Sequence, residues 1–500
     1  MTTRASRTGL LALALLAWPL AAHAEITLNN TFSAESDLRL VVDHDRGATP
    51  GEPFHFNWNR NSLDLKSEAY INDDVRGVGH VRFLFFGLHR IDKMNDLLQR
   101  ERMDPFRVDS DAAFLEIKGF VLDALSLKLG RMIHSWGTAD QFSPTDNLNS
   151  RDFEDPLRFG GKLANQMVVA TYYLPWLQAS VQGVWIPMFR PTSLPDSATL
   201  GMAAENVFQM PVRDPVHKQG LTDDYYKKKP YFVFPDPAVA VHMPPTDLDN
   251  MSGGVRTKLR LGDYDLGFSY FYGRHTFPVP KRIYAWAGND VLVDGKTKTE
   301  QLQYVDLIYP RIQAIGFDFA ASLPWFFDLG VWIDAAAFHP ERVDLLMYTT
   351  NYVPGEACSA PGQAPGGLVC SRNSDPWYFK VTAGFDYTFT SWLYMNVQYL
   401  HGFDDEFGYE GAITDYVAGG VDLKFLNDVL LLRLFTLVNI TDVKDPHANS
   451  AIFFPQIVLT KWDSTELQLG AIFNFGDEDT RFGNKASGRN LVFTKVKLTY

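Results

Sequence analysis

The chain is short of cysteines and of long apolar runs. Its 500 residues include two cysteines, which limits disulfide bonding to one local bridge. Beyond the N-terminus, no segment supplies the roughly 20 consecutive apolar residues of a membrane-spanning helix. No linker or low-complexity stretch marks a boundary between domains. These shortages exclude a helical membrane protein and argue against a string of separate soluble domains.

Basic charge is also in short supply, because the formal net charge is -13. This acidic balance argues against nucleic acid as a partner. Catalytic motifs are missing as well, since no Gly-x-Ser-x-Gly turn, phosphate-cradling loop or cluster of metal ligands occurs. His134 and Ser135 are adjacent, but neighbours on a strand face opposite sides and cannot form a nucleophile–base pair. The sequence therefore predicts a protein that is not an enzyme and needs no cofactor or metal.

Residues 1–24 have the form of a secretory signal peptide. Arg4 and Arg7 supply the charged start, residues 10–20 form a short apolar core, and Ala24 completes a cleavage site of the small-x-small type. The mature chain is therefore expected to be exported. Two cysteines in an exported chain usually pair, and both lie in one Pro/Gly-rich stretch. We predict a disulfide that staples a loop, between Cys358 and Cys370.

The last twelve residues, 489–500, alternate in polarity up to the final position. Val492, Val496, Leu498 and Tyr500 fall on one face, and two lysines fall on the other. The stretch resembles the C-terminal signal of outer-membrane β-barrels, in which alternating apolar residues end in Phe or Tyr. The resemblance implies a closing barrel strand and an assembly signal at Val496, Leu498 and Tyr500, recognised by the barrel assembly machinery.

Similar alternation recurs from about Ser36 onward, in segments of roughly 10 to 13 residues, as expected for a transmembrane barrel. Short connections near 122–124, 174–176, 262–264, 323–325, 390–392, 426–428 and 461–463 take turns with long polar ones. Outer-membrane barrels alternate short periplasmic turns and long extracellular loops in this way. Four of the short turns carry a tryptophan that suits a membrane interface, namely Trp176, Trp325, Trp392 and Trp462.

These patterns predict an all-β fold, a transmembrane antiparallel β-barrel of about 18 strands. The predicted division is a signal peptide at 1–24, a short periplasmic segment at 25–35 and the barrel at 36–500, with both termini in the periplasm. The outer membrane of a Gram-negative bacterium, its lipid and its lipopolysaccharide are the expected surroundings.

The strand pattern also assigns charged residues to the lumen. Basic residues are predicted to face inward on two stretches of wall: Lys66, Arg82, Lys118 and Lys128, and then Arg256, Lys258 and Arg260. Acidic residues are predicted on a wall nearly opposite the first: Asp318, Asp328, Asp334 and Asp386. Opposed walls of this kind would tune ion selectivity. The alternative is that these charges pair locally, as any water-filled lumen requires.

One stretch, 129–152, is more motif-like than the rest. Its Gly-Arg, Trp-Gly, Asp and Pro-Thr-Asp elements resemble a strand-to-loop transition of large, poorly characterised Gram-negative outer-membrane barrels. The resemblance supports the fold and implies no defined chemistry. Several oxygen ligands in the stretch leave a calcium site open, although the spacing is irregular and a self-capped loop is the alternative: Asp140, Asp146, Asn147, Asn149 and Asp152.

The longest connection, 189–251, interleaves aromatic residues with lysines, and long loops are usually functional. Three roles stay open for this connection: a constriction in the lumen, a plug and an external cap. Two functions follow from the whole pattern. The first is a porin-like channel for polar solutes. The second is the barrel component of an envelope export machine, which passes an exopolysaccharide delivered by periplasmic export proteins.

Overall fold

The computed structural model describes most of the chain, namely residues 26–42, 54–89, 91, 94–139, 141–155, 157–158, 160–194, 232–233, 238–293, 296–349, 368–371, 377–407, 413–477, 480–483 and 490–500. The signal peptide and Cys358 fall outside these residues, so the cleavage site and the disulfide stay predictions. No helix within the described ranges is long and apolar enough to cross a membrane.

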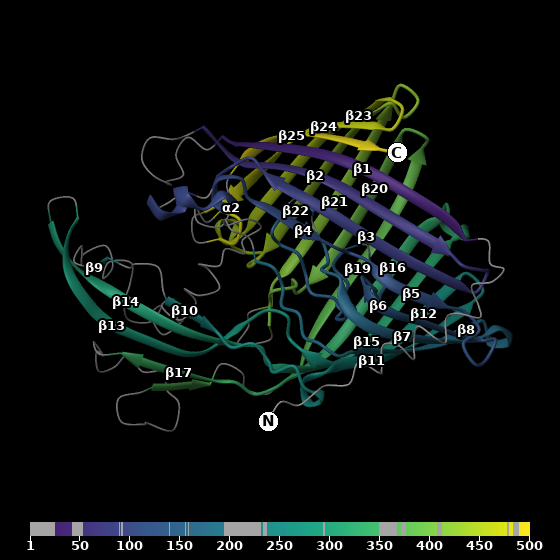
Figure 1. Cartoon of the computed structure of the whole chain (residues 1–500), viewed down its shortest axis with the longest axis horizontal. Helices are drawn as coiled ribbons and strands as arrows, with labels where there is room; N and C mark the ends of the chain where they lie inside the picture. Colours follow the sequence, from purple (N-terminus) through teal and green to yellow (C-terminus); the bar gives the residue numbers. More distant parts are fainter. Residues whose placement is uncertain are drawn as a thin grey trace.

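Nineteen antiparallel strands form one closed sheet, the barrel of Figure 1. β4 and β5 pair with successive parts of β3, so they share one position and the ring has 18 positions. The strands are β1 (Thr27–Val41), β2 (His55–Tyr70), β3 (Val75–Phe86), β4 (Phe106–Asp109), β5 (Ala113–Ile117), β6 (Leu125–Met132), β7 (Asn165–Leu174), β8 (Ala179–Ile186), β11 (Ser252–Leu261), β12 (Tyr264–Arg274), β15 (Arg311–Leu323), β16 (Leu329–Pro340), β19 (Tyr378–Thr390), β20 (Leu393–His401), β21 (Asp415–Phe425), β22 (Leu430–Ile440), β23 (Ser450–Trp462), β24 (Thr465–Gly476) and β25 (Leu491–Thr499).

The ring closes between the first and last strands, as the alternating C-terminus predicts. β25 pairs with β1 from Val41 opposite Leu491 to Ser33 opposite Thr499. Beyond them, the amide of Phe32 donates to the carbonyl of Tyr500 at 2.8 Å, and the amide of Tyr500 donates back at 2.7 Å. The first and last strands therefore pair with each other and the sheet closes, which is what a sheet in lipid requires.

The two faces of the sheet differ sharply in polarity. On β25 the outward side chains of Val496 and Leu498 are exposed, whereas Phe493 on the inner face is buried. Exposed apolar side chains likewise cover the outward faces of β3, β12 and β19. Inward positions carry most of the charged residues of the strands. An apolar outer belt around a polar interior is the pattern of an outer-membrane barrel.

Short turns lie at one end of the barrel and long connections at the other. All seven predicted turns are confirmed, and another joins β2 to β3 at 71–74. The four predicted rim tryptophans lie in or beside these turns with about half or more of their surface exposed. Gln178, Phe327 and Ser464 adopt left-handed backbone there, which lets these connections reverse within a few residues.

The N-terminal boundary at 25–35 was wrong, because β1 already begins at Thr27. Residues 27–32 are polar enough to suggest a loop, but they extend the ladder against Leu65–Tyr70 of β2. The long connection between β12 and β15 contains a hairpin, β13 with β14. The hairpin belongs to a second, six-stranded sheet: β9 (Phe232–Val233), β10 (Ala238–Val241), β13 (Val279–Val293), β14 (Lys296–Ile308), β17 (Asp344–Thr349) and β18 (Leu368–Ser371).

The second sheet is built from three long connections and projects from the loop end of the barrel (Figure 1). β10 joins β14 in parallel, and β17 joins β13 in parallel. The helices of the described residues are short: η2 (Met94–Leu98), α2 (Arg100–Met103), η3 (Pro175–Leu177), η4 (Leu248–Asn250), η5 (Pro324–Phe326) and η6 (Pro446–Ala448).

Candidate functional site: the lumen and its inserted loop

The connection between β6 and β7, residues 133–164, folds into the barrel; we name it the lumen loop. Although it has no regular secondary structure, many of its described side chains are buried. Trp136 and Leu148 pack in one apolar cluster with inward residues of β7, β8 and β15, while Phe142 and Phe153 pack in another with β21 to β25. The loop thus contacts two different stretches of the inner wall.

A first attachment joins the lumen loop to β16 and β19. The carboxylate of Asp334 accepts hydrogen bonds from the amides of Thr138 and Ala139, both at 2.9 Å, and from the Thr138 hydroxyl at 2.6 Å. Asp334 is fully buried. On the next strand, the hydroxyl of Thr382 donates to the carbonyl of Phe142 at 2.6 Å. These contacts fix the start of the loop to this wall.

A second attachment lies on β1 and β2. Asp155 of the lumen loop forms ion pairs with Arg39 at 2.6 Å and with Arg60 at 2.7 Å, and all three side chains are at most 5% exposed. The guanidinium of Arg39 also lies 4.5 Å from the ring centroid of Trp58. Burial raises the pKa of Asp155, but the two guanidinium groups outweigh burial and hold the pKa well below its usual value.

These two attachments lie on opposite walls. β2 and β16 are nine positions apart in the 18-position ring, which is half of its circumference. A third contact, between Arg151 and Asp404 at 2.9 Å, ties the loop to the connection after β20. A fourth, from the indole of Trp136 to Gln182 of β8 at 2.8 Å, reaches the wall between them. The lumen loop is therefore a strap across the lumen.

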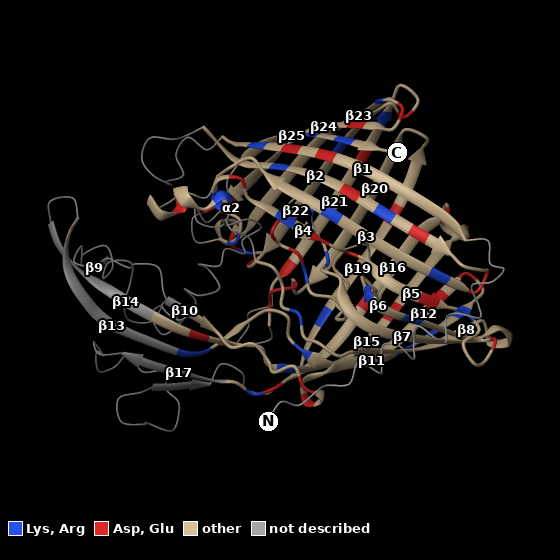
Figure 2. Cartoon of the chain, viewed as in Figure 1, with Lys and Arg blue, Asp and Glu red and all other residues tan. Residues whose placement is uncertain are grey.

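Most of the first predicted basic group faces inward, but each inward member has an acidic neighbour. Lys66 pairs with Glu68 at 2.7 Å, Lys128 pairs with Glu116 at 3.3 Å, and Arg82 pairs with both Asp64 and Asp111. Figure 2 shows acidic and basic positions interspersed along β1, β2 and β3. The structure thus favours the local-pairing alternative over a purely basic wall.

The acidic group behaves in a similar way. Asp318 and Asp334 lie directly opposite each other on β15 and β16, and Asp318 pairs with the buried guanidinium of Arg256 from β11. Asp386 faces inward and accepts a hydrogen bond from the hydroxyl of Tyr394 at 3.1 Å. Asp334 holds the lumen loop instead of facing open water. These carboxylates lie opposite β2 and β3, as predicted, but they do not form a free acidic wall.

Two predicted lumen residues lie in turns. Lys118 follows the end of β5, and Asp328 precedes β16 with a left-handed φ of 59°. Both side chains are exposed at the short-turn end of the barrel. Both residues continue the alternation of the inward-facing positions, but each lies one position outside its strand. A pattern of alternation does not show where pairing ends, so these two assignments to the wall were wrong.

The second basic group lies on the inner face of β11. Arg256 is neutralised by Asp318, and Arg260 lies 3.8 Å from Asp265 with both side chains mostly exposed. Lys258 forms no ion pair with the described residues, although the charges of Arg256, Asp318 and Asp265 all act on its amine. Of the predicted lumen cations that lie on strands, Lys258 is thus the one whose charge is least compensated by a neighbouring carboxylate.

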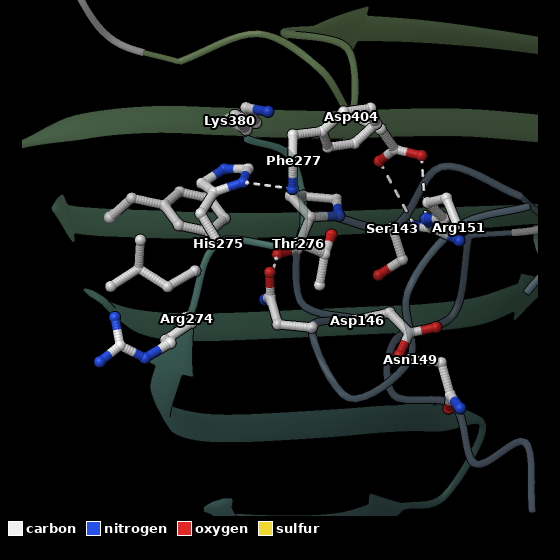
Figure 3. Close-up of a pocket in the computed structure, with 14 residues that line it drawn as sticks. Ser143, Asp146, Asn149, Arg151, Arg274, His275, Thr276, Phe277, Lys380 and Asp404 are labelled. Carbon is white, nitrogen blue, oxygen red and sulfur yellow. Dashed lines mark hydrogen bonds and ion pairs between the residues drawn. The ribbon is translucent and has the colours of Figure 1, made fainter. Parts of the chain in front are cut away.

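A cavity of about 50 Å³ lies between the lumen loop and the wall of β15, β16 and β19. Figure 3 shows Arg151 and Asp404 joined on one side and His275 near Lys380 on another. Phe277 and Phe338 supply apolar surface. The Nδ1 atom of His275 accepts the amide of Phe277 at 3.3 Å, and burial beside Lys380 lowers the pKa of the imidazole well below its usual value. The neutral imidazole of His275 therefore carries its proton on Nε2.

The calcium hypothesis finds little support in the described part of the lumen loop. Asp146 pairs with Lys162, whose ammonium would compete with a cation. The side chain of Asn149 bonds to the backbone of His134 and Leu163. No group of three or more potential metal ligands occurs within the described ranges. Asp140 lies outside them.

His134 and Ser135 point to different partners. The imidazole of His134 bonds to Gln182 at 2.8 Å, and the hydroxyl of Ser135 accepts from Lys162 at 2.8 Å. They therefore do not form a nucleophile and base. Sequence reasoning missed Arg39, Arg60 and Asp155, which form the second attachment. Their signal is faint: a carboxylate in a long loop, and inward arginines on the first two strands.

Comparison with known proteins gives likeness of architecture alone. No family model matches the chain, and no curated protein matches it. Among solved structures, Acinetobacter baumannii OccAB3 is 10% identical with a TM-score of 0.48, over 95% of this chain and 99% of that one. Pseudomonas aeruginosa OpdK is 9% identical with a TM-score of 0.45, over 94% and 99%. The Escherichia coli capsule-assembly barrel Wzi is 11% identical with a TM-score of 0.42, over 99% and 89%.

The closed ring, the apolar belt and the alternation of short turns with long loops are the properties of an outer-membrane β-barrel. The chain is an integral β-barrel of the Gram-negative outer membrane. Val496 and Leu498 contribute to its lipid-facing surface, and Tyr500 ends the closing strand at the periplasmic rim. Their role as an assembly signal stays a prediction.

Proposed function

We propose that this barrel is a diffusion channel for small polar solutes, narrowed by the lumen loop. The observation that carries the proposal is a closed 18-position ring with a charged inner wall and one strap across it. A ring of this strand number is wide enough for water unless loops fill it. A strap leaves polar space beside itself, and the cavity next to Lys380 and Arg151 is part of that space.

The charge pattern supports weak selectivity by sign. Most inward charges are paired with neighbours, so their fields cancel within a few ångström and do not add across the lumen. Among the predicted basic residues on the inner wall, Lys258 forms no ion pair within the described residues, and we infer that it favours anions modestly. A narrower hypothesis therefore replaces the opposed walls predicted from the sequence. The other predicted lumen residues make the lumen polar, and Lys258 sets its preference for anions.

Export of a polymer is the less favoured function. A strap attached to opposite walls by buried ion pairs and hydrogen bonds would obstruct the passage of a chain of sugars. Periplasmic export proteins, lipopolysaccharide and the barrel assembly machinery stay predicted partners. We also infer a non-catalytic role, supported by the separate partners of His134 and Ser135.

The test is conductance in planar bilayers, together with swelling of liposomes in small and large sugars. We expect discrete openings for the wild type, with entry of arabinose and exclusion of the tetrasaccharide stachyose. A double variant, Asp155→Asn with Asp334→Asn, releases two attachments and should admit larger solutes. Silence of the wild type together with conduction by the variant would overturn the free channel and favour a plugged barrel opened by a partner. Silence of both would overturn transport through this lumen.

A further inference from the structure

The outward face of β1 and β2 carries a row of polar side chains inside the apolar belt. The hydroxyl of Ser36 donates to the side chain of Asn61 at 2.8 Å, and the amide nitrogen of Asn61 donates to Asn59 at 3.0 Å. Ser36 and Asn61 are directly opposed in the ladder. We name Ser36, Asn59 and Asn61 the amide row.

The amide row is bounded by apolar surface on both sides along the strand. Leu63 and Leu65 are exposed on the same face toward the periplasm, and Phe54 and Phe56 are exposed toward the loop end. On the neighbouring strand Phe85, 47% exposed, lies directly opposite Asn61. The row thus lies within the belt that faces lipid and not at a water-exposed rim.

Acyl chains offer no hydrogen-bond partner to an amide. The side-chain nitrogen of Asn59 donates to no other described group, although its oxygen accepts from Asn61. The outward face of β16, on the opposite wall, avoids this chemistry between its ends, where Val331 and Ile333 point outward. The row therefore marks one side of the barrel as different from the opposite side.

The same face of the barrel is also low nearer the periplasm, beyond Leu63 and Leu65. Gly77 and Gly79 of β3 face outward, and a methyl group added at either would meet nothing within 4 Å. They lie opposite Ala69 and Ser67 of β2. Small residues on a lipid-facing surface allow another polypeptide to approach closely, and polar groups there gain partners from it.

We propose that the β1–β3 face is an interface with a second copy of this chain. An asparagine amide is both donor and acceptor, so the same row on a second copy complements it when the face meets itself. Two copies related by a two-fold axis bring Asn59 and Asn61 of one against those of the other. The spare donor of Asn59 then finds an acceptor that lipid does not provide. This interface does not depend on which solute crosses the lumen.

The test places the photoreactive amino acid p-benzoylphenylalanine beside the row in intact cells. Leu63→p-benzoylphenylalanine leaves the row in place, and Ile333→p-benzoylphenylalanine on the opposite wall is the matched control. After illumination we expect a chain–chain adduct from position 63, identified by mass spectrometry through peptides of β1 to β3, and none from position 333. Adducts from position 63 to lipopolysaccharide or to another protein alone, or none at all, would overturn the proposal.

A second variant tests the amides themselves. Asn59→Leu with Asn61→Leu makes the row apolar, so it should improve contact with lipid while removing the bonds between copies. In native mass spectra of the detergent-solubilised barrel, we expect the wild type to be an oligomer and the variant a monomer, both still heat-modifiable. A wild type that is monomeric, or an oligomer unchanged by the substitutions, contradicts the interface. Should the variant fail to insert, the cross-link from position 63 still decides.

Discussion

At the scale of single residues, the lumen shows why charged side chains counted by sign are a poor guide to selectivity. Lys128 and Glu116 are opposed in the ladder between β5 and β6, so their charges cancel across one pair of strands. Lys258 forms no ion pair of this kind in the described part of the wall, although Asp318 and Asp265 act on it from farther away. A distant solute senses the sum of nearby charges, and a close pair contributes little to it.

The first prediction separates paired from unpaired charge. Removing a whole pair, Glu116→Gln with Lys128→Gln, should leave the reversal potential of the channel unchanged in a salt gradient. Lys258→Gln should shift the reversal potential toward cations, because it removes a charge that no neighbour cancels. Equal shifts for the two variants would show that the opposed-wall hypothesis describes the lumen better than local pairing does.

The attachment at Asp155 also has a defined dependence on pH. A carboxyl group whose pKa falls on docking contributes attachment free energy that is complete above its undocked pKa, about 4. That contribution is lost as pH falls through the lower pKa of the docked state. Since Arg39 and Arg60 depress the pKa of Asp155, the attachment is fully formed throughout the neutral range and under mild acid.

We therefore expect the same conductance at pH 8 and pH 5 in the wild type, as far as Asp155 determines it. Asp155→Asn removes one partner from buried guanidinium groups, which typically costs about 3–5 kcal/mol. Single-channel records of this variant should show larger or noisier openings. Asp104→Asn is the matched control, because Asp104 forms an exposed ion pair with Arg100 and such pairs contribute little. Records identical to wild type would mean that the strap does not depend on Asp155.

At the scale of elements, the barrel is predictable because lipid imposes period-2 alternation on each strand. Residues 495–500 alternate strictly in polarity, and the strand and its closing partner followed from the pattern at the C-terminus. The turns were predictable because apolar segments stop beside Trp176, Trp325 or Trp392. The start of β1 was missed because Asn29, Asn30 and Thr31 carry no apolar pattern. They form a strand because they pair with β2, and a local sequence pattern does not show such pairing.

The lumen loop could not be predicted by the same reasoning. Residues 133–164 have no period, because their backbone is held by side chains of the wall instead of a ladder. The motif at 129–152 did mark the segment as unusual, and Trp136 in a polar loop was a hint of burial. Which wall residues receive it depends on contacts such as Thr138 with Asp334, which are 196 positions apart. A local sequence pattern does not show that two residues so far apart in the chain are in contact.

Gly137 is where the entry of the lumen loop is most constrained. Its φ is +93°, and a methyl group would lie 2.0 Å from the hydroxyl oxygen of Ser143 and 2.5 Å from a carboxylate oxygen of Asp334. We expect Gly137→Ala to destabilise the docked loop by about 1–3 kcal/mol. Limited proteolysis of the loop should accelerate. The matched control is Gly183→Ala on β8, where nothing lies within 4 Å. Equal cleavage of the two variants would contradict the attachment at Thr138.

At the scale of the whole molecule, the two ends of the barrel differ in construction. One end has tight turns and the closing contact between Phe32 and Tyr500. The other carries the long connections, and three of these contribute strands to the projecting sheet (Figure 1). Insertion from the periplasm leaves short turns there and carries long loops outside. The orientation of the entire chain therefore follows from the length of its connections.

The connection between β16 and β19 provides a direct test of that orientation. It leaves the barrel after Pro340 and returns at Tyr378, at the end opposite the turn 324–328. A peptide tag inserted between Cys358 and Cys370 should bind antibody on intact cells, because this connection emerges outside. A tag in the turn after Trp325 is the matched control and should bind antibody only after the outer membrane is permeabilised. The reverse pattern would place the projecting sheet and the entrance above the lumen loop in the periplasm, and solutes would then meet the strap from the other side.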